Sequence, residues 1–228
     1  MEFKGVIDKL ILVKLTTRQR SQQALQCISK AKALTHNPTR IKWLISLDTD
    51  DSTSTGLSID IRNIIPDAHI YFGASHSKIH ANNRDVEAFS KMEEWDILLN
   101  LSDDQECIAE GWDNTIRESM HNDLDRSLWF YDGLQSSINT MEIVGRNYYN
   151  RTGTIYNTGY KSFYCDEEST IVAAKLGKQI KDTRCLFKHN HPAGNAAIKN
   201  DALYNKNQAY WDADKRLFQD RWAINFNV

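Results

Sequence analysis

The amino-acid sequence predicts an α/β fold in which helices flank a mostly parallel central sheet and a C-terminal helix closes the chain. Short apolar runs alternate with segments of helical spacing through the first half, and polar or acidic residues follow most of these runs. The 228 residues are 41% hydrophobic and 25% charged, as expected of a globular protein with a substantial core. Alternation of this kind is typical of doubly wound, Rossmann-like sheets.

The strands of the first half are predicted from runs that are apolar on both faces, as strands inside a parallel sheet are. They span residues 10–15, 41–47, 68–72 and 97–101. Apolar residues spaced by three and four positions predict the helices between these strands, at 22–34, 59–65 and 78–92. The polar stretches 16–21 and 52–56 are expected to form a turn and a loop.

The second half of the chain is less regular. Its patterns predict helices at 111–120 and 166–176 and short strands at 128–131, 142–144, 148–149 and 184–187. The acids that open the second of these helices suit the positive end of a helix dipole. A long helix is expected over 201–222, where large apolar residues recur every seven positions and should therefore pack against the rest of the protein.

Charge and hydropathy narrow the classes of function. The formal net charge is −2 and the pI is about 6.4, so no global positive field exists to hold a nucleic-acid backbone. No apolar run approaches the roughly 20 residues of a membrane span, and the first residues show no signal-peptide pattern. The four cysteines are scattered without a Cys-x-x-Cys pair, which is typical of reduced thiols in a cytoplasmic protein.

An acidic cluster follows the predicted strand 97–101. The strand stops at Ser102, and Asp103, Asp104 and Glu106 come directly after it. Carboxylates crowded at a strand end repel one another unless a cation or hydrogen-bond donors compensate, and Mg²⁺ or Mn²⁺ would satisfy them. Ligands of open α/β sheets bind beyond the carboxyl ends of the strands, so this cluster is a candidate metal and phosphate site. The alternative is a polar turn in which Ser102 or Asp103 caps a helix.

His189 and His191 form a second candidate metal-binding feature. A His-x-His pair on a strand places both rings on one face, because side chains alternate between the two faces of a strand. Neutral imidazole is a ligand that Mn²⁺ accepts alongside carboxylates. The pair therefore predicts either a metal site or an exposed polar edge.

The order of these segments resembles the GT-A glycosyltransferases, in particular glycosyltransferase family 2, over most of residues 10–192. The resemblance rests on Leu15-Thr16-Thr17-Arg18-Gln19-Arg20-Ser21, Asp48-Thr49-Asp50-Asp51, Lys78-Ile79-His80-Ala81-Asn82-Asn83-Arg84, Leu101-Ser102-Asp103-Asp104, Gly111-Trp112-Asp113 and Cys165-Asp166-Glu167-Glu168. One position departs from the family's Asp-x-Asp metal motif, because Leu101 stands in place of the first acid.

The resemblance implies a metal-dependent glycosyltransferase, of the inverting type, that moves a sugar from a UDP- or GDP-sugar to a hydroxyl acceptor. Carboxylate-bound Mn²⁺ or Mg²⁺ would stabilise the charge that develops on the leaving diphosphate. The acceptor hydroxyl would need a general base within hydrogen-bond reach. Asp166 is the first candidate for this base and Glu167 the second.

The same resemblance assigns the binding residues. The residues expected to bind the nucleotide sugar are Thr16, Arg20, Asp48, Asp50, Lys78, Asn83, Ser102 and Asp103. Asp48 and Asp50 would accept hydrogen bonds from the nucleobase or ribose, and Arg20, Lys78 and Arg84 would face the phosphates or the base. The expected metal ligands are Asp103 and Asp104, completed by His189 or His191.

We expect a single domain over residues 1–228. Its nucleotide-sugar-binding half would span 10–105, its acceptor half 106–192 and a helical extension 193–228. The acceptor would lie over the second half, near Tyr131, the run 146–151 and the two histidines. A saccharide and a hydroxylated nucleobase in DNA are among the alternatives for it.

Two other functions stay open from the sequence alone. A sugar-nucleotide nucleotidyltransferase would share the sheet topology, although the turn 16–21 lacks the glycines of its usual phosphate loop. A non-catalytic nucleotide-sugar-binding module is compatible with the incomplete Asp-x-Asp motif.

Overall fold

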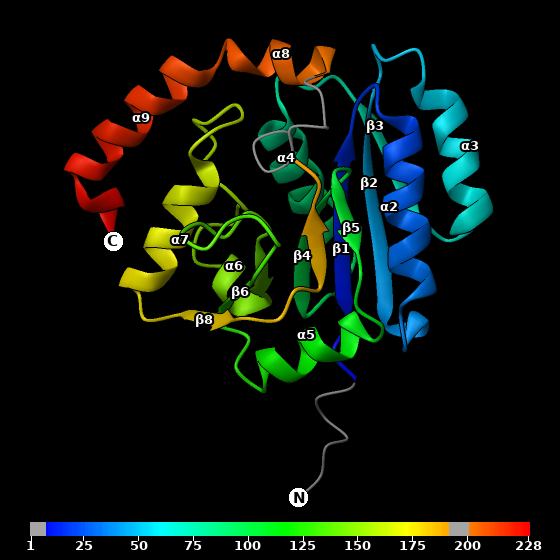
Figure 1. Cartoon of the computed structure of the whole chain (residues 1–228), viewed down its shortest axis with the longest axis horizontal. Coiled ribbons are helices and arrows are strands. Elements are labelled where there is room, and N and C mark those ends of the chain that lie inside the picture. Colours follow the sequence, from blue (N-terminus) through cyan, green and yellow to red (C-terminus); the bar gives the residue numbers. More distant parts are fainter. Residues whose placement is uncertain (1–7, 192–200) are drawn as a thin grey trace, which may run out of the picture.

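A computed structural model of the protein describes residues 8–191 and 201–228. Its centre is a seven-stranded sheet with the order β3-β2-β1-β4-β7-β6-β8, and a separate small sheet pairs β5 with β9 (Figure 1). The strands are β1 (Ile11–Thr17), β2 (Ile41–Asp48), β3 (His69–Gly73), β4 (Ile97–Ser102), β5 (Gln105–Cys107), β6 (Ser127–Phe130), β7 (Ile143–Gly145), β8 (Gln179–Asp182) and β9 (Phe187–His189).

Most strands of the large sheet run in one direction. β1 is parallel to β2 and β4, β2 to β3, and β6 to β8, whereas β7 runs antiparallel between β4 and β6. The predicted mostly parallel α/β sheet is therefore confirmed. The chain moves outward from β1 through β2 to β3 and then returns to the other side of β1 at β4. Ligands of open α/β sheets bind at such a reversal, beyond the carboxyl ends of the strands.

Helices cover both faces of this sheet. Helices α2 (Ser21–Ala33), α3 (Ser54–Ile64) and α5 (Trp112–Met120) bury apolar side chains on one face, and α4 (Lys78–Ser90), α6 (Arg146–Tyr149) and α7 (Cys165–Lys175) do so on the other. The C-terminal segment forms α8 (Ala202–Gln208) and α9 (Trp211–Ala223), and short 3₁₀ turns occupy η1 (Pro38–Arg40) and η2 (Asn225–Asn227). Figure 1 shows α8 crossing above the carboxyl ends of the strands and α9 descending beside α7.

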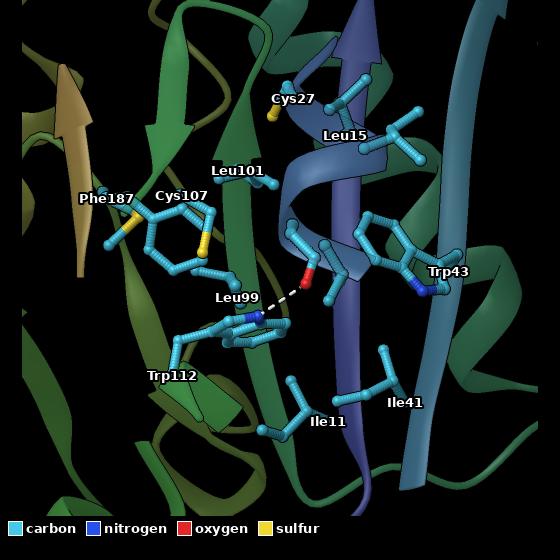
Figure 2. Packing of buried hydrophobic residues seen from close by; sticks show 14 of the residues in the cluster. Ile11, Leu15, Cys27, Ile41, Trp43, Leu99, Leu101, Cys107, Trp112 and Phe187 are labelled. Carbon is cyan, nitrogen blue, oxygen red and sulfur yellow. Dashed lines mark hydrogen bonds between the residues drawn. The ribbon is translucent and has the colours of Figure 1, made fainter. Parts of the chain in front are cut away.

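The α2 face carries the larger core. Alternate residues of β1, such as Ile11 and Leu15, point into it, as the two-residue repeat of a strand requires. Trp112 is fully buried there, and its Nε1 donates to the Ala31 carbonyl at 2.8 Å (Figure 2). The ring of Phe187, from β9, meets the Trp112 ring edge-on with centroids 5.4 Å apart. This contact fixes β9, and with it the histidines that follow, against the main sheet.

Several local predictions were wrong. Residues 148–149 belong to helix α6 and not to a strand, and α3 begins at Ser54, inside the expected loop 52–56. The strand expected at 184–187 lies instead at Phe187–His189, where it pairs with the unpredicted β5. The expected helix 201–222 is two helices, because α8 crosses the strand ends whereas α9 packs beside α7.

A buried ion pair anchors α5. Asp113 and Arg117 are both inaccessible to solvent and meet at 2.6 Å. Asp113 also accepts hydrogen bonds from the backbone N–H groups of His36 and Asn37, both at 2.9 Å. Arg117 donates to the carbonyl of Lys9 at 2.8 Å. The pair therefore joins α5 to the segment after α2 and to the chain entering β1.

Lys14 is a second buried charge, on the face of β1 that α4 covers. Its Nζ donates to the Leu15 carbonyl at 3.0 Å and to the hydroxyls of Thr16 and Ser46 at 2.7 Å. Burial lowers the pKa of Lys14 to about 7, against the opposing charge of Asp85. The ammonium group therefore sits beneath Thr16 at the end of β1.

The free energy of unfolding should rise with pH from about 7 to 10.5 because of Lys14. In that window the unfolded chain still binds a proton on this side chain that the folded protein has released. Urea unfolding at several pH values should show a smaller rise for Lys14→Met than for the wild type. Lys42→Met, which removes a partly exposed lysine of β2, should show the same rise of the unfolding free energy with pH as the wild type. An equal rise in Lys14→Met and in the wild type would show that Lys14 is not its cause.

Within residues 8–191 and 201–228, every helix is too short or too polar to cross a membrane.

Candidate active site

A cavity of about 600 Å³ opens at the carboxyl ends of β1 and β4. Much of its lining comes from the ends of these strands, helix α2, the first turns of α4 and α7, the β5–β9 pair with the residues after it, and the two C-terminal helices. In Figure 1, α8 crosses over this end of the sheet. The topology thus gathers segments that are far apart in sequence at the edge where α/β sheets bind ligands.

Asp103 follows β4 directly and is buried. Its Oδ2 accepts a hydrogen bond from the Thr17 hydroxyl at 2.7 Å, and its Oδ1 accepts one from Arg20 Nη1 at 3.1 Å. Burial and the charge of Asp104 raise the pKa of Asp103 to about 6, and Arg20 opposes this shift. Both oxygens of Asp103 are therefore held by β1 and the turn after it.

Asp104 lies next to Asp103 on the cavity wall. Its Oδ2 is 3.6 Å from His189 Nε2, whereas its Oδ1 is buried and has no hydrogen-bond partner among the described residues. Burial alone raises the pKa of Asp104, but the interaction with His189 outweighs it and holds this pKa below its usual range. Asp104 therefore stays ionised and offers one unused carboxylate oxygen.

The β5–β9 pair brings His189 to the acidic cluster. Its Nδ1 lies 3.2 Å from Asp132 Oδ2, and its backbone N–H donates to the Asp132 carbonyl at 2.8 Å. Burial opposes protonation, but Asp104 and Asp132 outweigh it and raise the pKa of His189 to about 9. A protonated imidazole has no lone pair to give a metal, so this geometry makes His189 an ion-pair partner.

His191 also lines the cavity, with its ring centroid 5.1 Å from that of His189. Burial and the positive charge of His189 lower the pKa of His191. A neutral imidazole is able to bind a metal. His191 could therefore bind a metal without first losing a proton, whereas His189 would have to lose one.

These residues fit a divalent cation as part of a ligand set. Asp104 supplies the unused carboxylate oxygen and His191 a neutral imidazole, while Asp103 is engaged by Thr17 and Arg20. In the part of the chain that the structure describes, no three Asp, Glu, His or Cys side chains gather closely enough to form a closed cage. A cation at Asp104 would take further ligands from water and phosphate oxygens, as Mg²⁺ commonly does.

The two candidate bases lie on the same cavity, in the first turn of α7. The backbone N–H of Glu167 donates to Asp166 Oδ1 at 3.0 Å. Burial raises the pKa of Asp166, and the charge of Lys78 opposes this effect. Burial and the charge of Asp166 raise the pKa of Glu167. A raised carboxyl pKa on a cavity wall is typical of a general base.

Lys78, a predicted donor-binding residue, opens α4 and lines the cavity. Its charge lowers the pKa of Asp104 and that of Asp166, so it lies within electrostatic reach of both acids. Ser77 caps this helix by accepting a hydrogen bond from the His80 N–H at 3.2 Å. A lysine at a helix N-terminus attracts phosphate groups.

Helix α4 turns Asn82, and not the predicted Asn83, toward the cavity. Asn82 Oδ1 accepts a hydrogen bond from Thr16 at 2.5 Å, and both residues line the cavity. The amide of Asn83 instead donates to the Tyr156 carbonyl at 2.8 Å and accepts from the Ile155 N–H at 2.9 Å. This placement does not support the predicted role of Asn83 in donor binding, because its amide ties α4 to a loop.

Asp48 and Asp50 end β2 as expected, but neither lines the cavity. Arg18 Nη1 donates to Asp48 at 2.8 Å, and Nη2 donates to Asp50 at 3.0 Å. The predicted contact of these acids with a nucleobase is therefore not supported by their placement. Arg84 also turns away from its expected phosphate role, because its guanidinium pairs with Asp85 at 2.6 Å.

Arg20 and Ser102, two further predicted donor-binding residues, line the cavity. Arg20 additionally binds Asp201, with its Nε 2.6 Å from Oδ2 and its Nη2 3.0 Å from Oδ1. Asp201 caps α8 by accepting a hydrogen bond from the Tyr204 N–H at 2.7 Å. The ion pair thus joins α8 to the turn after β1.

Sequence reasoning missed several residues of the cavity or its support. They are Asn82, Asp132, Tyr164, Asp201 and Trp211. Asp201 carried a signal, since an acid that precedes a helix is a common cap. The predicted acceptor positions Tyr131 and 146–151 do not line this cavity.

Neither protein-family models nor curated protein sequences match the chain. Solved structures do match its fold. The mannosyltransferase PcManGT from Pyrobaculum calidifontis, in complex with GDP-Man and Mn²⁺, has a TM-score of 0.63 at 11% identity, over 79% of this chain and 56% of that one. Residues 1–349 of TarS from S. aureus give 0.58 at 11% identity, over 80% and 61% of the two chains.

The same TarS fragment in complex with UDP gives a TM-score of 0.58 at 11% identity, over 78% of this chain and 60% of that one. The chain thus spans about three fifths of the length of these structures. Together with the strand order, these similarities show that the chain has a GT-A fold. The resemblance noted in the sequence is confirmed at the level of the fold.

Proposed function

We propose that this protein is a metal-dependent glycosyltransferase that uses a nucleoside diphosphate sugar. One observation carries the proposal: Asp104, Lys78 and Asp166 share one cavity at the carboxyl ends of β1 and β4. Sugar transfer needs three kinds of group, and these residues supply them. Asp104 is an ionised acid with an unused oxygen, Lys78 is a cation at a helix N-terminus, and Asp166 is an acid of raised pKa. The likeness to structures that hold GDP-Man with Mn²⁺ or UDP supports it.

On the donor side, the leaving diphosphate would lie between Lys78 and Asp104. Lys78 and the first turn of α4 would bind phosphate oxygens directly. Asp104 and His191 would hold Mn²⁺ or Mg²⁺, which supplies Lewis-acid stabilisation of the diphosphate charge when bound. Asp103, fixed by Thr17 and Arg20, would keep the neighbouring carboxylate in position.

On the acceptor side, Asp166 would accept the proton of the attacking hydroxyl. The burial that raises its pKa strengthens it as a base, because the proton is bound more firmly than by an exposed carboxylate. With one base and no second nucleophile invoked, the hydroxyl would displace the diphosphate directly, and direct displacement inverts the configuration of the sugar. We therefore assign an inverting mechanism, with Asp166 as the base and Glu167 beside it.

A non-catalytic nucleotide-sugar-binding module is the second candidate. The observation that favours it is the pairing of Asp103 with Arg20, in a motif where Leu101 replaces the first acid. An arginine in this position supplies part of the positive charge that a metal would otherwise bring. Metal-independent nucleotide binding without turnover would support this candidate.

Titration calorimetry of UDP and of GDP, with and without Mn²⁺, tests the proposal. We expect one nucleotide to bind at least about tenfold more tightly with Mn²⁺, and Asp104→Asn to lose this dependence, because the variant removes the charge that balances the ion. Glu87→Gln, on the exposed surface of α4, is the matched control and should bind as the wild type does. Equal affinity with and without Mn²⁺ in the wild type would refute the metal role.

A further inference from the structure

One wall of the cavity is aromatic, and its residues are not among the donor-binding groups proposed above. Phe163, Tyr164 and Trp211 line it, and Trp211 keeps 42% of its surface exposed. The Trp211 ring meets that of Phe163 at 67° with centroids 5.0 Å apart, and that of Tyr164 at 57° and 5.1 Å. The three rings form an angled surface and not a closed stack. We call these three residues the aromatic wall.

The aromatic wall adjoins the candidate base. Tyr164 precedes Asp166 by two residues and is the N-cap of α7, with a left-handed backbone at φ 63°. This conformation is uncommon for an aromatic residue, and such outliers concentrate at functional sites. A ligand resting on the wall would therefore present its groups to Asp166.

Helix α9 holds the wall in place. Asp214 is buried, and its carboxylate accepts hydrogen bonds from the backbone N–H groups of Lys161, Ser162 and Phe163 at 3.0, 2.8 and 2.8 Å. One helical turn before it, Trp211 closes the wall from the same helix. The loop and the helix that carry the three rings are thus fixed to each other, so the surface is formed before any ligand arrives.

The charge of the cavity distinguishes between ligand classes. Among the described residues, six Asp or Glu side chains and three Lys or Arg side chains line it. Protonated His189 adds a further positive charge, and Arg20, Lys30 and His189 are each paired with an acid. Besides burial, the charges of Glu167 and Asp212 raise the pKa of Tyr164, so acids flank the aromatic wall itself. At the aromatic wall these acids disfavour a phosphodiester backbone, whose binding depends on neutralisation by Lys and Arg, whereas the proposed diphosphate site lies at Lys78.

We propose that the aromatic wall is the acceptor subsite and that the acceptor is an uncharged saccharide. This inference rests on the proposed function, because it assigns the second substrate of that reaction. The C–H face of a pyranose carries partial positive charge and packs on the negative face of an aromatic ring. Its hydroxyl groups donate hydrogen bonds to carboxylates, and Glu167 stands beside the wall to accept them.

Saturation-transfer NMR with methyl glycosides tests the subsite without turnover. The probes are methyl β-glucopyranoside, methyl β-galactopyranoside and methyl α-mannopyranoside, beside a short single-stranded oligonucleotide at physiological salt. At least one glycoside should bind the wild type, and Trp211→Ala should weaken it about tenfold, because the variant removes one aromatic contact. Trp222→Ala is the matched control, since Trp222 is an exposed tryptophan of the same helix that does not line the cavity.

Trp211→Phe keeps an aromatic face and should retain most of the glycoside binding. This variant separates a binding role from a failure to fold, as do the melting curves of all three variants. Binding of the oligonucleotide in preference to every glycoside would overturn the proposal, and so would equal glycoside binding by Trp211→Ala and Trp222→Ala. Turnover of the nucleotide sugar by the wild type is measured separately. If a glycoside binds through Trp211 but no nucleotide sugar is turned over, the transferase function is refuted and the saccharide-binding site stands alone.

Discussion

Sugar transfer by Asp166→Asn should fall by about 10²–10⁴-fold relative to the wild type, the usual contribution of a general base. Asparagine has nearly the same shape and still accepts the N–H bond of Glu167, but it cannot take a proton. Affinity for the nucleotide is to be measured beside transfer, because a base acts on the acceptor and not on the diphosphate. The expected result is a loss of kcat with the nucleotide still bound.

The pH profile gives this prediction a second readout. Because burial raises the pKa of Asp166, activity of the wild type should fall on the acid side at a pH above the usual aspartate value of about 3.9. The rate falls as pH drops through that pKa, since the protonated base cannot accept a further proton. Asp166→Asn should lack this acid limb. Wild-type activity in Asp166→Asn, with a loss in Glu167→Gln, would move the base to Glu167.

The largest effect on stability is expected at the buried pair of α5. Asp113→Ala should lower the free energy of unfolding by about 3–5 kcal/mol, because it leaves the Arg117 charge buried without its partner. It also removes the acceptor of two backbone N–H groups, those of His36 and Asn37. Urea unfolding followed by circular dichroism measures the change.

Two controls separate the ion pair from the loss of packing. Asp113→Ala combined with Arg117→Met should be less destabilised than Asp113→Ala alone, because no unpaired charge then stays buried. Glu87→Ala breaks an exposed pair with Lys91 at the same four-residue spacing and should leave the unfolding midpoint near that of the wild type. Equal midpoints for Asp113→Ala and Glu87→Ala would show that the buried pair contributes little.

The parallel half of the sheet was predictable because each strand carries its own signal. Strands β1, β2 and β4 are buried on both faces, so their residues are apolar almost throughout. Strand β8 reads Gln-Ile-Lys-Asp and carries no such pattern, because its pairing with β6 determines its structure. The pairing of β5 with β9 joins segments about eighty residues apart, and three-residue strands hold too few side chains to show a period.

The sequence predicts the site residues whose position follows from a strand end. It does not predict those whose position depends on side-chain partners from distant segments. Asp103, Asp104 and Asp166 reach one cavity because the sheet topology brings their segments together. The pairing of Asp48 with Arg18 was not predictable, because Arg18 follows a different strand and no local pattern reveals the contact. The error at Asn83 is one of helical phase, since neighbouring positions on a helix point about 100° apart.

The dependence of the aromatic wall on α9 has a consequence for how this protein can diversify. The donor side is built from β1, β4 and α4, whereas the wall depends on Trp211 and on the single carboxylate of Asp214. If the proposed function holds, substitutions along α9 would change which alcohol is glycosylated while the proposed donor-binding groups stay intact. In a gene family, this helix is where we expect substrate preference to diverge first.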